Sequence, residues 1–449
     1  MRAAPELSAA EAYLEGLIDI EKQRAPQRAR LSLAPIRALL ERLGAPERGL
    51  SVVHVAGSKG KGSTALFAEA VLRAAGARVG TFTSPHLERW SERFRVDGAE
   101  VAPEQLAAAV EALRPHVDTL CAAGGAEVPS FFDATTAAAL LIFRDVRVDH
   151  AVLEVGLGGR LDSTNAVSPA VCCITSIELE HTELLGDTLA AVAAEKAGIL
   201  KPGVPAVCGD LPREALAVVE RRAAELGCPL ARIGREIEVE AETGAPDRTR
   251  LRYREGELRF EVDLRAPGAH QAANAALAVA AARRVLAPED PARIAAAARA
   301  GLAAAELPAR VEIVSHAPWI VVDAAHTGAS ARALAAVLAR LAAPVDFVLS
   351  VSAGKDTGAI LAALLPLARS LTLTRAEPVR SLDPAEIAAA ARAVDPKIAM
   401  RVVPNPHLAV RAAREALAPD AVLCATGSVY LAGIARRVLR APAPEIAGR

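Results

Sequence analysis

Residues 51–64 read SVVHVAGSKGKGST, an apolar run followed by a glycine-rich turn and by a helical run from Ala65. Glycines let several backbone N–H groups converge on one phosphate, and the N-terminus of the next helix adds partial positive charge. Lys61 is placed to reach the β- and γ-phosphates of a nucleotide, and a hydroxyl beyond it can meet phosphate or Mg²⁺. The segment therefore predicts a phosphate loop made of Gly57, Ser58, Lys59, Gly60, Lys61, Gly62, Ser63 and Thr64.

This loop departs from the general P-loop pattern. Val55 occupies the position of the first glycine, and Gly62 separates Lys61 from the hydroxyl residue. The alternative is an unrelated loop rich in glycine and lysine. The strand before it and the helix after it favour phosphate binding.

Short β-branched runs alternate with Ala- and Leu-rich helical runs along most of the chain. This alternation predicts an α/β fold with mostly parallel sheets covered by helices. The expected strands include 51–55, 150–154, 170–175, 320–322, 346–351, 371–374 and 421–424, and the expected helices include 33–43, 103–120, 188–197 and 329–341.

Two features interrupt this pattern. Residues 236–240, 250–253 and 258–264 alternate apolar and polar side chains and predict a small antiparallel meander. A proline-containing break at 304–310 predicts a linker between domains. We therefore expect a P-loop parallel-sheet ATPase domain with the meander over 1–305, and a smaller Rossmann-like α/β domain over 306–449.

Composition excludes several classes of protein. The 52 basic and 53 acidic residues nearly cancel, which argues against a nucleic-acid binder. No stretch approaches the roughly 20 apolar residues of a membrane span, and residues 1–6 lack the apolar core of a secretory signal. The six cysteines form no CxxC pair and lie mostly in apolar runs, which is typical of reduced, buried thiols. We expect a cytoplasmic monomer that acts on small molecules.

The spelling of residues 57–64 resembles the nucleotide loop of the folylpolyglutamate synthase/dihydrofolate synthase family, a branch of the Mur ligase superfamily. Ordered matches run through nearly the whole chain, at 83–87, 92–98, 130–133, 153–165, 181–186, 194–203, 270–275, 308–310, 323–326 and 426–433. The resemblance implies ATP-dependent ligation of L-glutamate to dihydropteroate or to tetrahydrofolyl-(poly)glutamate through an acyl phosphate. Segments 13–19 and 31–44 also resemble the start of the family, and the residues between them are expected to line the pterin site.

The expected metal ligands lie on four segments. Glu154 ends an apolar strand beside a glycine-rich turn, where parallel sheets place ligands. The resemblance implies that Glu154 and Ser84 bind one Mg²⁺, and that His181 and a carbamylated Lys196 bind a second. The alternatives are a solvated carboxylate, a structural histidine and a solvated lysine. With Lys61, three of these residues (Glu154, His181 and Lys196) form the expected catalytic set.

The resemblance also assigns ligand contacts in the second half of the chain. Asn274, Arg310 and Asp323 are implied to hold ATP, for which a helix-capping Asn and surface Arg and Asp are the alternatives. His326 and Ser428, with Ser84, are implied to contact substrate. Some positions differ from the usual family residues, namely Asp133, Ser176, Glu180, Thr327 and Gly328.

Two other functions remain open from the sequence. One is a Mur-type ligase that acts on another carboxylate and amino acid. The other is a P-loop kinase or regulatory nucleotide-binding module that makes no amide bond.

Overall fold

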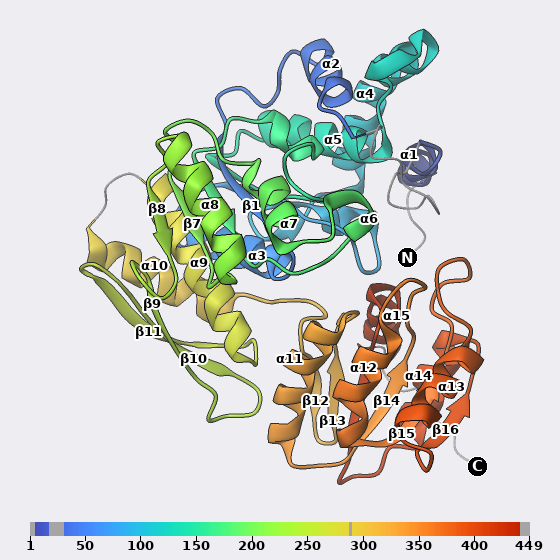
Figure 1. Cartoon of the computed structure of the whole chain (residues 1–449). Coiled ribbons are helices and arrows are strands. Elements are labelled where there is room, and N and C mark those ends of the chain that lie inside the picture. The colour runs from blue at the N-terminus through green and yellow to red at the C-terminus, as the bar shows by residue number, and fades with distance from the viewer. Residues whose placement is uncertain (1–4, 18–30, 287–289, 441–449) are drawn as a thin grey trace. The chain divides into compact units, whose positions relative to one another are not determined.

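The computed structural model describes residues 5–17, 31–286 and 290–440. The chain divides into two compact units, which are coloured blue to yellow and orange to red for most of their length in Figure 1. The first unit comprises Met1–Ala241, Leu251–Asp263 and Gln271–Ala305, and the second comprises Glu242–Arg250, Leu264–His270 and Glu306–Arg449. The assignment of domains to 1–305 and 306–449 stays a prediction. The segment expected to line the pterin site, 20–30, lies outside the described residues.

The first unit is built on an eight-stranded sheet with the order β4-β3-β2-β5-β1-β6-β7-β8. Neighbouring strands pair in parallel from β2 through β5, β1, β6 and β7 to β8. At the other edge, β3 pairs antiparallel with both β2 and β4. The central strands are almost wholly buried because helices cover both faces. The bounds are β1 Ser51–Ala56, β2 Val79–Phe82, β3 Phe94–Val96, β4 Ala99–Glu100, β5 His150–Glu154, β6 Val171–Ile174, β7 Ala206–Cys208 and β8 Leu230–Arg232.

Separate apolar clusters fill the space between this sheet and its helices. One cluster includes residues of α1, α2, α4 and α5, and another includes residues of α7 and α8. Alanine and glycine allow very close packing: a Cβ added at Gly301 of α10 would lie 2.4 Å from the backbone oxygen of Ala70 in α3. The helices are α1 Pro5–Glu15, α2 Ala34–Arg42, α3 Lys61–Ala74, α4 Pro103–Ala123, α5 Phe131–Asp145, α6 Thr182–Leu185, α7 Leu189–Ala197, α8 Arg213–Glu225, α9 Ala269–Val285 and α10 Pro291–Ala304.

The predicted meander is confirmed as a three-stranded sheet with the order β11-β10-β9. Its strands are β9 Glu238–Glu242, β10 Thr249–Glu255 and β11 Leu258–Leu264. Two residues join β10 to β11, so this pair forms a hairpin. The turn between β9 and β10 groups with the second unit, which alternation of side chains could not indicate.

The second unit contains a six-stranded sheet with the order β12-β13-β17-β14-β15-β16. All neighbours pair in parallel except β12, which is antiparallel to β13. The α/β class of both units is therefore confirmed. The bounds are β12 Glu312–His316, β13 Trp319–Val322, β14 Val345–Leu349, β15 Ala368–Leu373, β16 Ala399–Val402, β17 Val422–Thr426, α11 Gly328–Leu338, α12 Thr357–Leu364, α13 Pro384–Val394, α14 Pro406–Glu415 and α15 Val429–Arg440.

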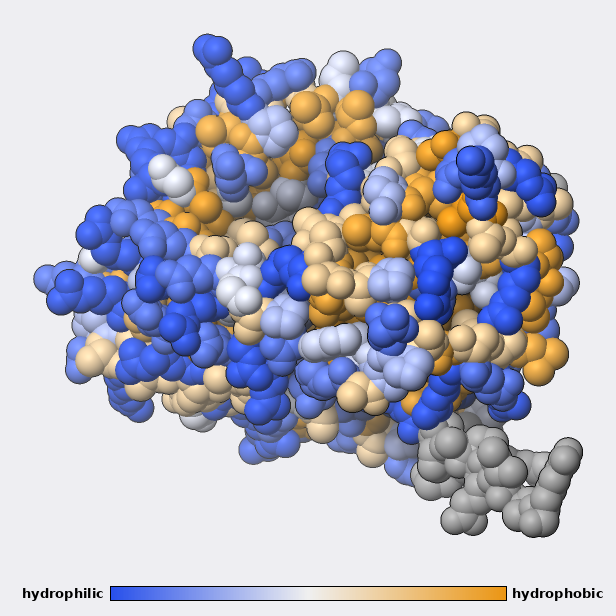
Figure 2. Space-filling model, turned by 90° about the horizontal axis from the view of Figure 1, so that it is seen from below, coloured by the Kyte–Doolittle hydropathy of each residue, from blue (hydrophilic) through white to orange (hydrophobic). Residues whose placement is uncertain are grey.

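The surface and the thiols agree with the composition. Among the described residues, no helix has the length and apolar character needed to cross a membrane. On the face shown in Figure 2, hydrophobic side chains are interspersed with hydrophilic ones. The six cysteines are free thiols, of which Cys121 is exposed and the other five are buried.

Candidate active site

The glycine-rich loop connects β1 to α3 and has almost no spare room. Gly57 and Gly60 have positive φ angles of 150° and 83°. A Cβ added at Gly57 would lie 1.9 Å from the Thr175 Oγ1, and one added at Gly60 would lie 2.2 Å from the Asn274 Oδ1. Both positions therefore require glycine, and the loop ends where α3 begins at Lys61.

The loop is anchored to the segment that follows β6. The backbone N–H of Ser58 donates to the Ser176 carbonyl (2.8 Å), and the N–H of Lys59 donates to the Ser176 Oγ (2.9 Å). The Ser58 hydroxyl also bonds to the backbone of Glu178, accepting from its N–H at 2.9 Å. Ser176, which differs from the usual family residue, thus anchors the phosphate loop.

The first turn of α3 offers groups suited to a phosphate ligand. The Lys61 ammonium donates to the Gly57 carbonyl at 3.0 Å, so it is folded back over the loop. The Thr64 hydroxyl oxygen is buried and has no hydrogen-bond partner within the described residues. Lysine, glycine backbone and hydroxyl are the group types that bind nucleotide phosphates, so these residues fit a nucleotide.

Glu154 and Ser84 lie beside this turn. The strands β2, β5 and β1 are parallel neighbours, so their carboxyl ends meet at one edge of the sheet. The Ser84 N–H donates to the Glu154 Oε2 at 3.0 Å, and a Cβ added at Gly62 would lie 3.4 Å from the same oxygen. A nearly buried carboxylate thus stands against the first turn of α3, which fits a hard cation bound together with phosphate oxygens.

Lys196 is buried, which contradicts the alternative of a solvated lysine. It lies in α7, is 1% exposed, and donates to the Gly57 carbonyl (2.9 Å) and to the Glu180 Oε1 (2.8 Å). Burial, with help from the nearby Lys61 charge, lowers the pKa of Lys196 to about 8, although Glu180 opposes this. Burial would raise the pKa of Glu180, but Lys196, Lys61 and Lys59 outweigh it and lower that pKa to about 2.

His181 lies at the start of α6 with a left-handed backbone and a side chain that is 43% exposed. Its Nδ1 is 4.0 Å from the Glu183 Oε1. Within the described residues, no group of three or more His, Cys, Asp or Glu side chains is arranged to hold a metal. Only Glu154 and His181 of the four expected metal ligands are of these types, so a Mg²⁺ bound here would need water and phosphate oxygens as well.

Arg310 and Asp323 come together in the second unit. Arg310 lies in the loop before β12, and Asp323 follows β13. The Asp323 carboxylate accepts from the N–H groups of Val311 (2.8 Å) and Ala325 (2.7 Å). Burial raises the pKa of Asp323, and these two hydrogen bonds oppose the rise. Asp323 therefore organises the loop that carries Arg310, a role that its sequence position alone did not indicate.

His326 and Ser428 follow β13 and β17, which are parallel neighbours. The His326 Nδ1 lies 2.9 Å from the Ala324 carbonyl. The Ser428 hydroxyl is buried and accepts from the N–H of Tyr430 at the start of α15 (3.2 Å). In this geometry Ser428 caps a helix, and His326 is oriented by its own loop.

The structure explains the other unusual positions by local packing. The Thr327 hydroxyl caps α11 by accepting from the Ser330 N–H at 3.3 Å. A Cβ added at Gly328 would lie 2.7 Å from the Ala359 Cβ, so glycine lets α11 approach α12. Asp133 accepts from the hydroxyls of Ser130 (2.6 Å) and Ser163 (2.7 Å) at the start of α5.

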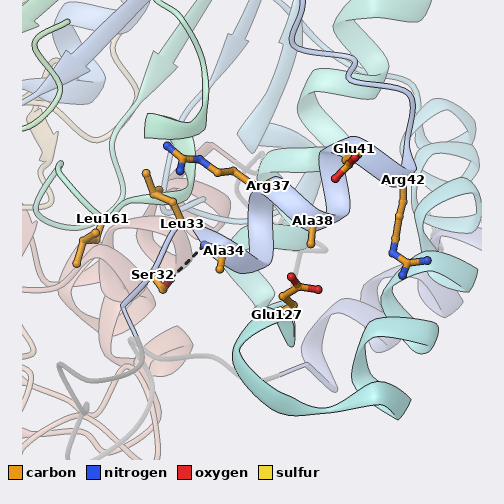
Figure 3. Close-up of a pocket in the computed structure, with 9 residues that line it drawn as sticks. All are labelled: Ser32, Leu33, Ala34, Arg37, Ala38, Glu41, Arg42, Glu127 and Leu161. Carbon is orange, nitrogen blue, oxygen red and sulfur yellow. Dashed lines mark hydrogen bonds between the residues drawn. The ribbon is translucent and has the colours of Figure 1, made fainter.

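An open pocket of about 850 Å³ lies along α2, as Figure 3 shows. Its charged lining has both signs, with Arg37, Glu41 and Arg42 on the helix and Glu127 below it. Leu161, from the turn that follows β5, lines the same pocket. The remaining lining residues are Ser32, Leu33, Ala34 and Ala38. Sequence reasoning named none of these residues as ligand contacts.

Comparisons with known proteins support the family suggested by the motifs. Residues 104–282 match the Mur ligase middle domain, and residues 309–429 match the Mur ligase glutamate ligase domain. The chain is 37% identical over 328 residues to the dihydrofolate synthase/folylpolyglutamate synthase of Bacillus subtilis, covering 72% of this chain and 76% of that protein. It is 36% identical over 407 residues to the corresponding protein of Mycobacterium tuberculosis, covering 86% and 82%.

A longer relative and two solved structures extend this likeness. The chain spans 47% of the length of a Haloferax volcanii protein named probable bifunctional folylpolyglutamate synthase/dihydropteroate synthase, with 36% identity over 89% of this chain. The structure of the M. tuberculosis folylpolyglutamate synthase complexed with ADP and AMPPCP is 32% identical, with a TM-score of 0.87, covering 97% of this chain and 99% of that chain. A Yersinia pestis enzyme complexed with AMPPNP and Mn ion is 30% identical, with a TM-score of 0.81, covering 98% and 100%. The chain therefore belongs to the folylpolyglutamate synthase/dihydrofolate synthase family of Mur ligases.

Proposed function

We propose that this protein is an ATP- and Mg²⁺-dependent ligase that joins L-glutamate to the carboxylate of dihydropteroate or of tetrahydrofolyl-(poly)glutamate. The observation that carries the proposal is the juxtaposition of a tightly packed glycine loop, the Lys61 ammonium and the Glu154 carboxylate at the start of α3. The names of the relatives and the nucleotides in the solved relatives supply the substrate class.

The nucleotide is proposed to lie on residues 57–64. Backbone N–H groups and the α3 N-terminus would bind the phosphates, and Lys61 would neutralise their charge. Asn274 touches the loop at Gly60 and is proposed to contact ATP there. Arg310 and Asp323 are proposed to complete nucleotide binding, since a guanidinium can bind phosphate oxygens through two N–H groups.

Two Mg²⁺ sites are proposed, one held by Ser84 and Glu154 and one by His181 and Lys196. Bound Mg²⁺ would neutralise the negative oxygens that phosphoryl transfer brings together. Lys196 can serve only after carbamylation by CO₂, because an ammonium cannot ligate a metal. Its burial supports this assignment, because the lowered pKa increases the fraction of neutral amine, the form that reacts with CO₂.

The proposed reaction has two steps. The γ-phosphoryl group of ATP passes to the substrate carboxylate and gives an acyl phosphate and ADP. The α-amine of glutamate then attacks the acyl carbon, and phosphate leaves. Positioning and charge neutralisation by residues of this chain supply the rate enhancement, and no covalent protein intermediate is required. Ser84, His326 and Ser428 are proposed to contact the folate or glutamate substrates.

A coupling assay tests the substrate assignment. The protein is incubated with ATP, Mg²⁺, labelled glutamate and either dihydropteroate or a tetrahydrofolate monoglutamate. We expect labelled product and ADP in equal amounts with at least one acceptor. ATP hydrolysis that does not depend on glutamate would instead favour a kinase or regulatory module. Coupling only with another carboxylate or amino acid would favour a different Mur-type ligase.

A matched pair of glycine substitutions tests the loop. Gly60 and Gly49 have nearly equal φ angles, 83° and 81°, but a Cβ at Gly49 has no atom within 4 Å. The left-handed backbone should cost each Gly→Ala variant about 1–2 kcal/mol of stability, and the contact with Asn274 should add to the loss only in Gly60→Ala. Only Gly60→Ala should displace Asn274 and raise the Kd for ADP. The Kd should rise by about tenfold for each 1.4 kcal/mol of binding free energy that is lost. Calorimetric titration with ADP measures this difference, and equal affinities in the two variants would contradict the assignment of Gly60 and Asn274.

A further inference from the structure

The backbone on both sides of Arg310 is strained. Ala309 and Val311 have φ angles of 52° and 51°, in the left-handed region. A residue with a Cβ rarely adopts this region, and a β-branched residue such as valine least of all. Such residues persist only where the surrounding contacts hold them in place. Contacts around Arg310 must therefore fix the backbone conformation of its two neighbours.

Several hydrogen bonds hold residues 309–311, including one from the Arg310 N–H to the Leu307 carbonyl (3.2 Å) and one from the Arg310 Nη1 to the Ala309 carbonyl (3.1 Å). The Ala309 N–H donates to the Glu312 Oε2 at 2.7 Å, and the Ala309 carbonyl accepts from the Ala324 N–H at 3.0 Å. The Val311 N–H donates to the Asp323 Oδ2 at 2.8 Å. One carboxylate thus fixes each strained residue, and Glu312 is the one that neither motif nor resemblance identified.

Glu312 is itself held from α15. The Arg436 Nε donates to the Glu312 Oε2 at 2.7 Å, and the Arg440 Nη2 lies 2.7 Å from the Glu312 Oε1. The side chains of Glu312 and Arg436 are only 11% and 10% exposed. A single oxygen, the Glu312 Oε2, therefore accepts from both the strained loop and the helix, and Glu312 and Arg436 are 124 positions apart in the sequence.

Stability alone is a weak explanation for such a pair. Burying two charges costs solvation energy that their attraction often only balances, and apolar residues of similar size commonly do as well. A carboxylate offers what an apolar pair cannot, an acceptor in a defined direction for the Ala309 N–H. The Glu312–Arg436 pair is therefore suited to holding the backbone of Ala309 in one conformation.

We propose that Glu312, held by Arg436, is a positioning residue that fixes the backbone at Ala309 and Val311 and thereby sets the position of the Arg310 guanidinium. This inference rests on the role of Arg310 in the proposed function. Glu312 contacts no reacting atom in this account and acts only through Arg310.

A double-mutant cycle between Glu312 and Arg310 tests the proposal. Glu312→Ala in the full-length protein should lower kcat and the affinity for an ATP analogue, with a combined loss of about 10- to 100-fold. This is the usual effect of removing a hydrogen-bond partner that orients a functional side chain. The KM for glutamate should stay within about twofold, because Arg310 is assigned to the nucleotide and not to glutamate. Arg310→Ala should show a loss at least as large. In the Arg310→Ala background, adding Glu312→Ala should change kcat by less than about twofold.

Two further variants keep the test independent of folding. Glu312→Gln keeps the side-chain size and one oxygen acceptor, so it should fold and lose less activity than Glu312→Ala. Asp346→Ala is the matched control, since Asp346 is 12% exposed and pairs with Arg369 elsewhere in the same sheet. It should shift the melting temperature and leave kcat and the affinity for the ATP analogue at the wild-type values.

The outcomes separate the two proposals. If Arg310→Ala impairs the enzyme but Glu312→Ala and Glu312→Gln match wild type, the positioning role is wrong and the proposed function stands. An equally large Glu312→Ala effect in the Arg310→Ala background would likewise overturn it, since Glu312 would then act by another route. If Arg310→Ala itself matches wild type, the assigned role of Arg310 fails, and the inference fails with it.

Discussion

Replacing Lys61 with alanine should lower the kcat of ATP-dependent glutamate ligation by about two to three orders of magnitude. Lys61 lies in the first turn of α3, and its ammonium donates to the Gly57 carbonyl at 3.0 Å. This hydrogen bond holds the ammonium close to the proposed phosphate position. Its positive charge stabilises the transition state of phosphoryl transfer most strongly, because negative charge then spreads over the phosphate oxygens. Steady-state assays with saturating ATP and glutamate measure the loss.

Lys201→Ala is the control for this experiment. Lys201 is a partly buried lysine of the same unit whose ammonium donates to the Asn165 carbonyl at 3.2 Å, outside the phosphate loop. Its replacement should leave kcat within a fewfold of wild type. Activity of Lys61→Ala close to that of Lys201→Ala would contradict the assignment of the loop.

Lys196→Ala should lower kcat by about two orders of magnitude or more, because an anionic ligand of the second metal site would be lost. Wild-type protein equilibrated with ¹³C-bicarbonate should show a carbamate signal by NMR, and Lys196→Ala should lack it. Formate or acetate should restore part of the activity of the variant, since a small carboxylate can supply the missing oxygen donor. A wild-type protein without the signal, or a fully active Lys196→Ala variant, would rule out the carbamate.

The pH dependence of this modification follows from the burial of Lys196. A lysine with a pKa of about 8 has about tenfold more neutral amine at pH 9 than at pH 7, whereas one near 10.5 stays almost wholly charged at both values. Since CO₂ reacts with the neutral amine, the carbamate signal at limiting bicarbonate should rise as the pH increases through 8. A signal that does not change between pH 7 and 9 would show that the lysine is not poised in this way.

The alternation of strands and helices was readable from the sequence because it depends on local patterns. Apolar runs such as 51–55 and 150–154 predicted strands, and the structure confirms both and places them in the middle of the sheet. Several strands of two to four residues, including β2, β3, β4, β7 and β8, were not predicted, because so few residues have too little periodicity to be recognised. The sequence showed Thr327 only as a departure from the usual family residue, and the structure shows that its hydroxyl caps α11.

The sequence alone predicted the loop glycines, Lys61, Glu154 and the family. Each of these depends on residues that are close together in the chain or on the order of motifs along it. Only the tertiary structure showed that Lys196 is buried against Gly57 and paired with Glu180, and that Glu312 meets Arg436. Burial and charge pairing arise when segments far apart in the chain pack together. No local pattern at Lys196 or Glu312 carries that information, so the environment of each charge became visible only in the folded protein.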